Sequence, residues 1–200
     1  RPKKNHLDLI RAWADVVAVH PDATLLVVGD GPCRCELERA VAGAGLTRSV
    51  RFLGSRSDVC EILRNVDGVV SASVDEALPT ALIEAAACGV PIVAADAGGT
   101  REIVLDGVTG RLVPLHDVPA LTGALLDTIA DPARAAGYGR AGRALAERTY
   151  AMAAWADQLR GLYREVLEPA SRRRPGRPRR TAPAARTPRN APRAACPSNA

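Results

Sequence analysis

Short apolar segments alternate with amphipathic ones along most of this sequence. Residues 24–29 (TLLVVG) and 90–95 (VPIVAA) are apolar and rich in β-branched side chains, a pattern typical of strands that are buried on both faces of a parallel sheet. Residues 5–19 instead place apolar side chains at helical spacing, and Pro21 prevents the helix from continuing. The pattern predicts strands and helices in alternation.

The predicted elements are joined by loops of a few residues. Strands are expected at residues 24–29, 50–53, 68–71 and 90–95. Helices are expected at residues 5–19, 33–42, 58–65, 79–88, 117–130, 131–147 and 152–167, and two of them open with the start signals Asp117 and Asp131. Such alternation specifies right-handed crossovers, so the fold class is α/β, a Rossmann-like parallel sheet with helices on both faces.

Ligands of such sheets bind outside the carboxyl ends of the strands. This rule places four turns at one edge, namely residues 29–31, the loop after Leu53, the loop that contains Glu76, and the Gly98-Gly99 pair. Two adjacent residues without side chains would let the backbone approach a ligand closely. The four turns are therefore expected to form one crevice.

The candidate chemistry lies between residues 73 and 102. Pro79 suits the first turn of a helix because it lacks an N–H group, and good helix formers follow it up to Gly89. The free N–H groups of residues 77–81 would hold an anion such as a diphosphate. Further along, Thr100 is expected to cap a short helix.

Two carboxylates, Glu76 and Glu84, are eight positions apart and cannot have the same role. Glu76 precedes the predicted helix, whereas Glu84 lies about a turn and a half inside it. The neighbours of Glu84 are mostly small and apolar, and an unpaired charge among them would be costly. This cost favours a ligand at Glu84.

Three motifs of this segment carry a resemblance to a known family. They are Ser73, Glu76, Leu78 and Pro79; then Glu84, Ala85, Ala87, Gly89 and Pro91; and finally Gly98, Gly99 and Glu102. At this spacing the sequence resembles the retaining, nucleotide-sugar-dependent glycosyltransferases of the GT-B fold, specifically the large family 4 with its Glu-x7-Glu signature. The family most often has Gly after the first Glu, where this chain has Ala77.

The resemblance implies that residues 1–168 are the second half of a GT-B fold, an N-terminally truncated nucleotide-sugar-binding domain. The acceptor would bind to a first domain that this chain lacks, so the chain alone is expected to be inactive. Lys4 matches the Lys of the family's Arg-Leu-x-x-x-Lys stretch, whose Arg would fall upstream of Arg1. We therefore expect transfer by a retaining enzyme of the hexosyltransferase type, with nucleotide sugar and acceptor as partners.

The same resemblance implies roles for individual residues. Lys4 and the helix N-terminus near Pro79 would stabilise the departing diphosphate, Glu84 would bind the ribose, and Glu76 would reach the transferred sugar. The expected donor site comprises Lys4, Gly31, Leu53, Glu76, Ala77, Leu78, Pro79, Glu84, Gly98 and Gly99, of which Glu76 and Lys4 are the expected catalytic residues. No cofactor and no metal are expected, because the sequence contains no Asp-x-Asp motif.

Three other functions remain open from the sequence. Paired carboxylates could be the acid and base of a glycosidase, although a helix-terminus phosphate site favours a phosphorylated donor. A nucleotide-sugar epimerase shares the two-domain fold but does not usually carry the full Glu-x7-Glu segment. A non-catalytic nucleotide-sugar-binding module is the alternative that involves no enzyme.

Charge divides the chain into two parts. Residues 169–200 hold nine Arg and no acidic residue, whereas residues 1–168 have a net charge of −4. Pro, Arg, Ala and Ser leave little to bury, so we expect a disordered tail. The tail would make weak contacts with polyanions or a membrane surface, and the alternative is an AT-hook at Gly176, Arg177 and Pro178. No specific nucleic-acid partner is expected.

The cysteines and the lack of a membrane-spanning segment bear on the cellular compartment of the protein. Five cysteines without a framework spacing favour a reduced, cytoplasmic protein, which the tail could bring to the inner membrane face. The sequence shows no cleavable signal and no run of about 20 apolar residues.

The last predicted helix carries an apolar stripe of Trp155, Leu159, Leu162, Tyr163 and Val166. Packing on its own domain and packing on a partner domain are equally open for this stripe.

Overall fold

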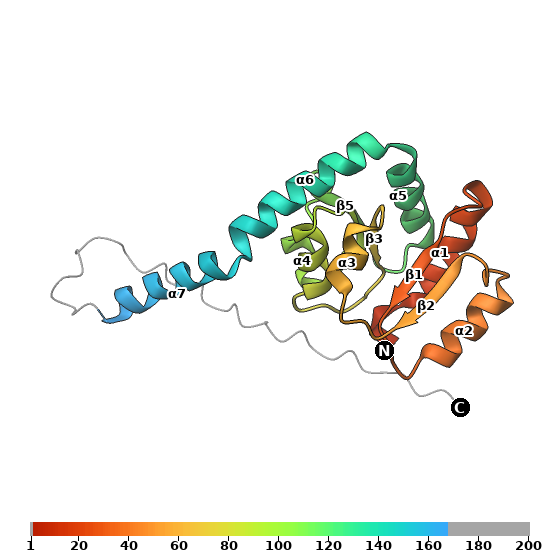
Figure 1. The fold of residues 1–200 in the computed structure, drawn as a ribbon, viewed down its shortest axis with the longest axis horizontal. Coiled ribbons are helices and arrows are strands. Elements are labelled where there is room, and N and C mark those ends of the chain that lie inside the picture. Colours follow the sequence, from red (N-terminus) through yellow and green to blue (C-terminus); the bar gives the residue numbers. More distant parts are fainter. Residues whose placement is uncertain (1, 168–200) are drawn as a thin grey trace, which may run out of the picture. The chain divides into compact units, whose positions relative to one another are not determined.

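The computed structural model describes residues 2–167, which form an α/β fold with the predicted order of elements (Figure 1). The strands are β1 (Leu25–Val28), β2 (Val50–Gly54), β3 (Val69–Ser71), β4 (Ile92–Ala95) and β5 (Gly110–Val113). The helices are α1 (His6–Val19), α2 (Arg34–Gly43), α3 (Val59–Arg64), α4 (Thr80–Ala87), α5 (Val118–Ala130), α6 (Pro132–Thr149) and α7 (Met152–Leu167). Two short 3-10 helices are η1 (Pro2–Lys4) and η2 (Gly98–Glu102).

The chain divides into two units after Arg160, and all five strands and the helices α1 to α6 belong to the first unit. The predicted tail at residues 169–200 and the boundary at residue 168 lie outside the described residues. Of the apolar stripe on the last helix, Trp155 belongs to the first unit and is 55% exposed.

All strand pairings are parallel, as predicted, but they form two sheets. In the first sheet β1 pairs with β2, and Leu25 lies opposite Val50. In the second sheet β4 lies between β3 and β5, and Val93 faces both Val70 and Arg111. Within the described residues no pairing joins the two sheets. An apolar pattern identifies strands but does not say which strands are neighbours.

Strand β4 has a hydrophobic core on each of its two faces. Side chains of β4 alternate, so that Val93 and Ala95 pack with α1 and α5, whereas Ile92 and Ala94 pack with α3, α4 and α6. All four are buried, as predicted for a strand covered on both faces. The first core also contains Leu25 of β1, and it therefore connects the two sheets.

Helix starts follow the sequence signals in two cases and depart from them in a third. The side chains of Asp117 and Asp131 each accept a hydrogen bond from a backbone N–H three residues on, at 2.9 Å, which confirms them as N-caps. Thr100 was expected to cap a helix, and this was wrong. It is a buried residue inside η2, which begins at Gly98 without a side-chain cap. No helix among residues 2–167 is long and apolar enough to cross a bilayer.

Candidate functional site

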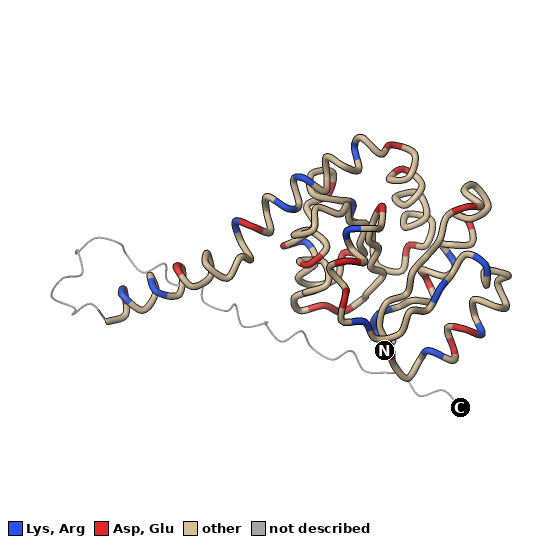
Figure 2. Tube along the Cα trace, viewed as in Figure 1, with Lys and Arg blue, Asp and Glu red and all other residues tan. Residues whose placement is uncertain are grey.

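The loop that leaves β3 meets the N-terminal turn of the chain. The Glu76 carboxylate accepts a hydrogen bond from Lys4 Nζ at 2.5 Å, and its side chain is 11% exposed. The backbone N–H of Val74 donates to the Lys3 carbonyl oxygen at 2.9 Å, and the Lys3 ammonium lies 3.4 Å from Asp75. In Figure 2, blue positions near the N-terminus adjoin red positions of this loop. Residues 72 positions apart are thus held together at the carboxyl edge of β3.

Glu76 is held in its ionised form. Burial of its carboxyl group raises the pKa, but hydrogen bonds from Lys4 and Ser73 outweigh burial, and the pKa of Glu76 lies below its ordinary value. At neutral pH the site therefore contains a carboxylate paired with an ammonium group. Each charge is available to an incoming ligand of opposite sign once the pair separates.

Gly98 and Gly99 lie directly behind this loop. A Cβ atom on Gly98 would overlap the Glu76 carbonyl oxygen, and one on Gly99 would overlap that of Ala77. The Gly99 N–H also donates to the Glu76 carbonyl at 2.9 Å. The two glycines were expected to admit a ligand. In the structure the close approach is instead to the backbone of the Glu76 loop, which they hold in place.

Helix α4 points its N-terminus toward the same loop. Pro79 is the N-cap, and its carbonyl accepts from the N–H of Leu82 at 2.9 Å. No side chain caps this end, so the N–H groups of Thr80 and Ala81, which precede Leu82, are available to an anion. Ala77 and Leu78, which lead into the helix, are exposed. An anion site at this helix end stays a prediction, and the exposed backbone leading into α4 is compatible with it.

Glu84 is not buried, contrary to the argument that its apolar neighbours favour a ligand. Helix α4 buries Leu82, Ala85 and Ala86 against the sheet, and Glu84 lies on the exposed side. Its carboxylate makes no hydrogen bond or ion pair with the described residues. A helix repeats every 3.6 residues, so apolar neighbours in the sequence do not surround Glu84 in space. The assignment of ribose to Glu84 now depends on the family resemblance alone.

The remaining predicted residues, Gly31 and Leu53, belong to the β1–β2 side of the domain. The Gly29 N–H donates to the Gly54 carbonyl at 2.7 Å, and the Arg34 guanidinium lies 6.0 Å from the centre of the Phe52 ring. The structure thus brings together Lys4, Glu76, Ala77, Gly98 and Gly99. Gly31 and Leu53 flank the Gly29–Gly54 contact that joins the carboxyl ends of β1 and β2.

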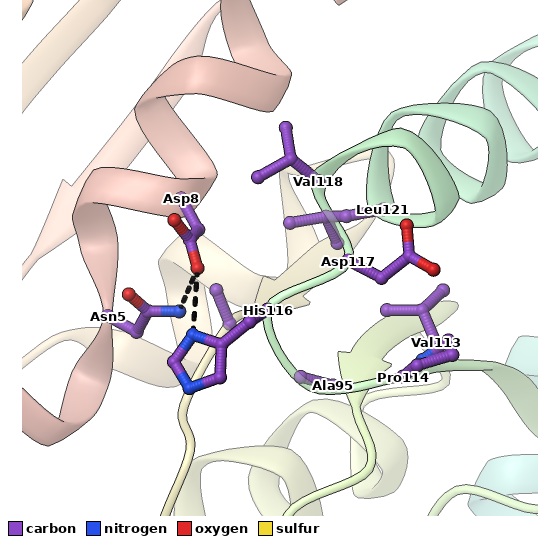
Figure 3. A pocket seen from close by; sticks show the side chains of 10 residues that line it. Asn5, Asp8, Ala95, Val113, Pro114, His116, Asp117, Val118 and Leu121 are labelled. Carbon is purple, nitrogen blue, oxygen red and sulfur yellow. Dashed lines mark hydrogen bonds and ion pairs between the residues drawn. The ribbon is translucent and has the colours of Figure 1, made fainter.

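A third polar cluster was missed from the sequence. Asn5, Asp8 and His116 line a pocket with Ala95 and Val113, at the carboxyl ends of β4 and β5 (Figure 3). Asp8 Oδ2 accepts a hydrogen bond from Asn5 Nδ2 at 2.6 Å and lies 3.2 Å from His116 Nδ1. Asn at a helix start was a usable signal, whereas nothing in the sequence linked His116 to α1.

Potential metal ligands are dispersed in the described part of the chain. Among residues 2–167, no three His, Cys, Asp or Glu side chains are grouped closely enough to bind a metal ion. Cys33 and Cys35 are free thiols. The positive charge at the Glu76 loop comes from Lys4, from Lys3 beside Asp75, and from the first turn of α4.

Comparisons with known proteins agree on one family. The family model described as "Glycosyl transferases group 1" matches residues 1–131. The sequence is 38% identical over 151 residues to the GDP-mannose-dependent alpha-(1-6)-phosphatidylinositol monomannoside mannosyltransferase of Mycolicibacterium smegmatis. That match covers 71% of this chain and 40% of the relative. The chain therefore spans less than half the length of this curated relative.

Solved structures share the fold. A crystal structure of Anabaena HepE in complex with UDP superposes with a TM-score of 0.77 at 29% identity, over 82% of this chain and 46% of that protein. The C-terminal domain of a glycosyl transferase group 1 family protein from Francisella tularensis gives a TM-score of 0.68 at 29% identity. In that case the match covers 76% of this chain and 82% of the other domain.

Proposed function

The chain belongs to the group 1 glycosyl transferases, and on this premise we propose that it is the donor-binding half of a GT-B enzyme. It would bind a nucleoside diphosphate sugar for transfer of the sugar to an acceptor. The observation that carries the proposal is the pairing of Glu76 with Lys4, backed by Gly98-Gly99 and facing the uncapped end of α4. A glycosidase, an epimerase and a non-catalytic module are less well supported, because the matching family and the M. smegmatis relative are glycosyl transferases.

The proposed chemistry follows from the charges of the site. Transfer breaks the bond between the sugar and the diphosphate, and negative charge develops on the departing diphosphate. The Lys4 ammonium and the N–H groups at the start of α4 would stabilise that charge. Glu76, released from Lys4, would then accept hydrogen bonds from sugar hydroxyls. Ala77 and Leu78 would contribute backbone N–H groups.

We further propose a retaining mechanism, hexosyl transfer, membership of family 4, and donor binding without a divalent metal. These finer assignments are supported by the Glu76 and Glu84 spacing and by the two sources of positive charge. Because the chain spans 40% of the M. smegmatis relative, the acceptor is proposed to bind elsewhere in a longer protein. A cytoplasmic location and a contact of the tail with membranes or polyanions stay predictions.

Calorimetric titration of the 200-residue chain with UDP, GDP, UDP-glucose and GDP-mannose tests donor binding. We expect at least one nucleotide to bind with the same affinity in EDTA and in magnesium. Glu84→Gln should weaken binding about tenfold, as expected for loss of hydrogen bonds to a charged group. Glu147→Gln, which also neutralises an exposed helix carboxylate, is the matched control and should bind normally. Binding that disappears in EDTA would contradict the metal-free proposal.

A second experiment tests whether donor binding suffices for transfer. The purified chain is incubated with the nucleotide sugar that binds and with a panel of acceptors. We expect no transfer, because both substrates must be held in register for the reaction. Robust transfer by this chain would show that the acceptor site is within its 200 residues.

A further inference from the structure

Two non-glycine residues of the described chain adopt a left-handed backbone conformation. They are Asn5, with φ of 50°, and His116, with φ of 60°. Such angles are uncommon for residues with a Cβ, although Asn and His adopt them more often than most. The two positions are 111 residues apart in the sequence, yet both side chains reach the same carboxylate.

That carboxylate belongs to Asp8, a buried residue in the first turn of α1. Figure 3 shows Asn5 and His116 on one side of it, each joined to Oδ2 by a dashed line. The distances are 2.6 Å to Asn5 Nδ2 and 3.2 Å to His116 Nδ1, while Arg11 donates to Oδ1 at 2.9 Å. The positive charge of Arg11 is sufficient to balance the carboxylate of Asp8. The contacts from Asn5 and His116 are therefore not needed to neutralise it.

The cluster connects the starts of two helices. Asn5 is the N-cap of α1, and His116 directly precedes Asp117, the N-cap of α5. The two helices pack against each other and share buried residues of the core. A carboxylate near two helix N-termini is favourably placed for the dipoles of both. Asp8 thus fixes the start of α1 relative to the end of β5.

The position of Lys4 depends on the same junction. Asn5 is the single residue between η1, which ends at Lys4, and α1, which begins at His6. Its φ and ψ angles therefore set the direction in which the chain leaves α1. The left-handed conformation directs the preceding turn to the loop after β3, where Lys4 meets Glu76 at 2.5 Å.

We propose that Asp8, acting through Asn5 and His116, is a positioning residue that holds Lys4 at the diphosphate site. This inference rests on the proposed function, in which Lys4 binds the diphosphate. The Asp8 side chain itself contacts Asn5, Arg11 and His116. Its effect on a ligand is therefore indirect, and it is transmitted along the backbone from Asn5 to Lys4.

A double-mutant cycle on the full chain tests the proposal. UDP and GDP are titrated into the wild type, Lys4→Ala, Asp8→Asn and the double variant, and the tighter nucleotide serves as the probe. We expect Asp8→Asn to weaken binding roughly three- to tenfold when Lys4 is present, and by less than about twofold when Lys4 is absent. Removal of a negative charge near a diphosphate would by itself strengthen binding, so a loss indicates misplacement of Lys4.

His116→Gly is expected to keep the fold. The His116 side chain is 65% exposed, and Gly adopts positive φ without strain. The variant should reproduce part of the Asp8→Asn loss, again only when Lys4 is present. Asp131→Asn alters the N-cap carboxylate of α6 and serves as the control. Because Asn caps a helix about as well as Asp, the variant should leave nucleotide affinity unchanged and thermal stability close to that of the wild type.

The possible outcomes separate this proposal from the one on which it rests. If the wild type binds neither nucleotide, or if Lys4→Ala binds as well as the wild type, the proposed role of Lys4 fails and the positioning role falls with it. If Lys4→Ala weakens binding but Asp8→Asn and His116→Gly do not, donor binding stands and the positioning role is overturned. Equal losses with and without Lys4 would also overturn it, since they would show a purely structural role.

Discussion

The Glu76 side and the β1–β2 side of the domain are held together in different ways. At the Glu76 loop, backbone meets backbone, because Gly98 and Gly99 leave no space for a side chain. At the β1–β2 turns, the Arg34 guanidinium spans two exposed carboxylates on its own helix and the preceding loop. Interlocked backbones fix geometry before a ligand arrives, whereas exposed ion pairs contribute little to stability.

This difference suggests a division of labour within the donor site. The Glu76 side would hold the diphosphate and the sugar, which every nucleoside diphosphate sugar contains. The β1–β2 side, with Gly31 and Leu53, would face the base, and its exposed side chains are free to differ between proteins. The M. smegmatis relative is named for GDP-mannose, and the Anabaena structure holds UDP. Two proteins similar to this chain are thus associated with different bases.

The largest expected effect is that of Gly99→Ala. The new Cβ would overlap the Ala77 carbonyl oxygen, so the loop or η2 must move. We expect a loss of about 1–3 kcal/mol in the free energy of unfolding. Nucleotide affinity should fall at least tenfold. Chemical denaturation and calorimetry measure the two quantities.

Gly43→Ala is the matched control on the β1–β2 side. Gly43 ends helix α2, and a Cβ there would meet no atom within 4 Å. This substitution should leave stability unchanged or raise it by up to about 1 kcal/mol, with normal affinity. Equal losses in the two variants would abolish the contrast between the two sides.

The second prediction concerns the two carboxylates of the motif. Glu76→Gln removes the ionic partner of Lys4. We therefore expect the sugar-free nucleoside diphosphate to bind a few-fold more tightly, because Lys4 can bind the phosphates without first breaking its ion pair with Glu76. Affinity for the nucleotide sugar should rise less, since Glu76 is proposed to contact the sugar.

Glu84→Gln is expected to act in the opposite direction and to weaken both ligands. Paired titrations with UDP and UDP-glucose, or with GDP and GDP-mannose, compare the two variants. If both substitutions changed affinity in the same direction and by the same factor, the two carboxylates would have one role. The distinction drawn from their different exposure would then be wrong.

Much of the fold follows from local patterns in the sequence. Alternating apolar runs identified β1 to β4, and Asp117 and Asp131 marked two helix starts. These signals involve residues that are close in sequence, where local backbone conformation determines whether a strand or a helix forms. The split into two sheets did not follow, because pairing depends on contacts between distant segments.

The sequence predicted which residues belong to the candidate site better than it predicted the contacts among them. The motif spacing located Glu76, Gly98 and Gly99, but it did not show that the glycines support the loop behind Glu76. No pattern in the sequence predicted left-handed backbone at Asn5 and His116, so these two junctions were missed. A rule based on residue type cannot identify a strained position that tertiary contacts stabilise.

A smaller effect is expected from pH on the N-terminal side of the site. Burial lowers the pKa of His6, with a further contribution from Lys4, so the folded state binds a proton less readily than the unfolded chain. Stability is then fully present above the ordinary His value of 6.5 and is lost as pH falls through the folded pKa. The pKa values of Asp8 and Glu76 are also lowered. The contribution of these two carboxylates to stability is lost only at more acidic pH, where carboxyl groups become protonated.

Thermal unfolding between pH 8 and pH 5 measures this dependence. The midpoint temperature of the wild type should fall over the lower part of the range, and His6→Asn should reduce the slope. His20→Asn, at the other end of α1, should retain the wild-type slope. A wild-type profile that is flat down to pH 5 would contradict the role assigned to His6.

The smallest effect is expected on the β1–β2 side, from Arg34→Ala. Arg34 pairs with Asp30 and Glu38 at 3.3 and 2.8 Å, but these side chains are between 36% and 50% exposed. Water and salt screen such pairs, and holding the side chains costs conformational entropy. The midpoint of thermal unfolding should stay within about 2 °C of the wild type, and diphosphate affinity within about threefold. A loss as large as that of Gly99→Ala would show that the β1–β2 turns are as rigidly organised as the Glu76 loop, and that the base is held by a preformed site.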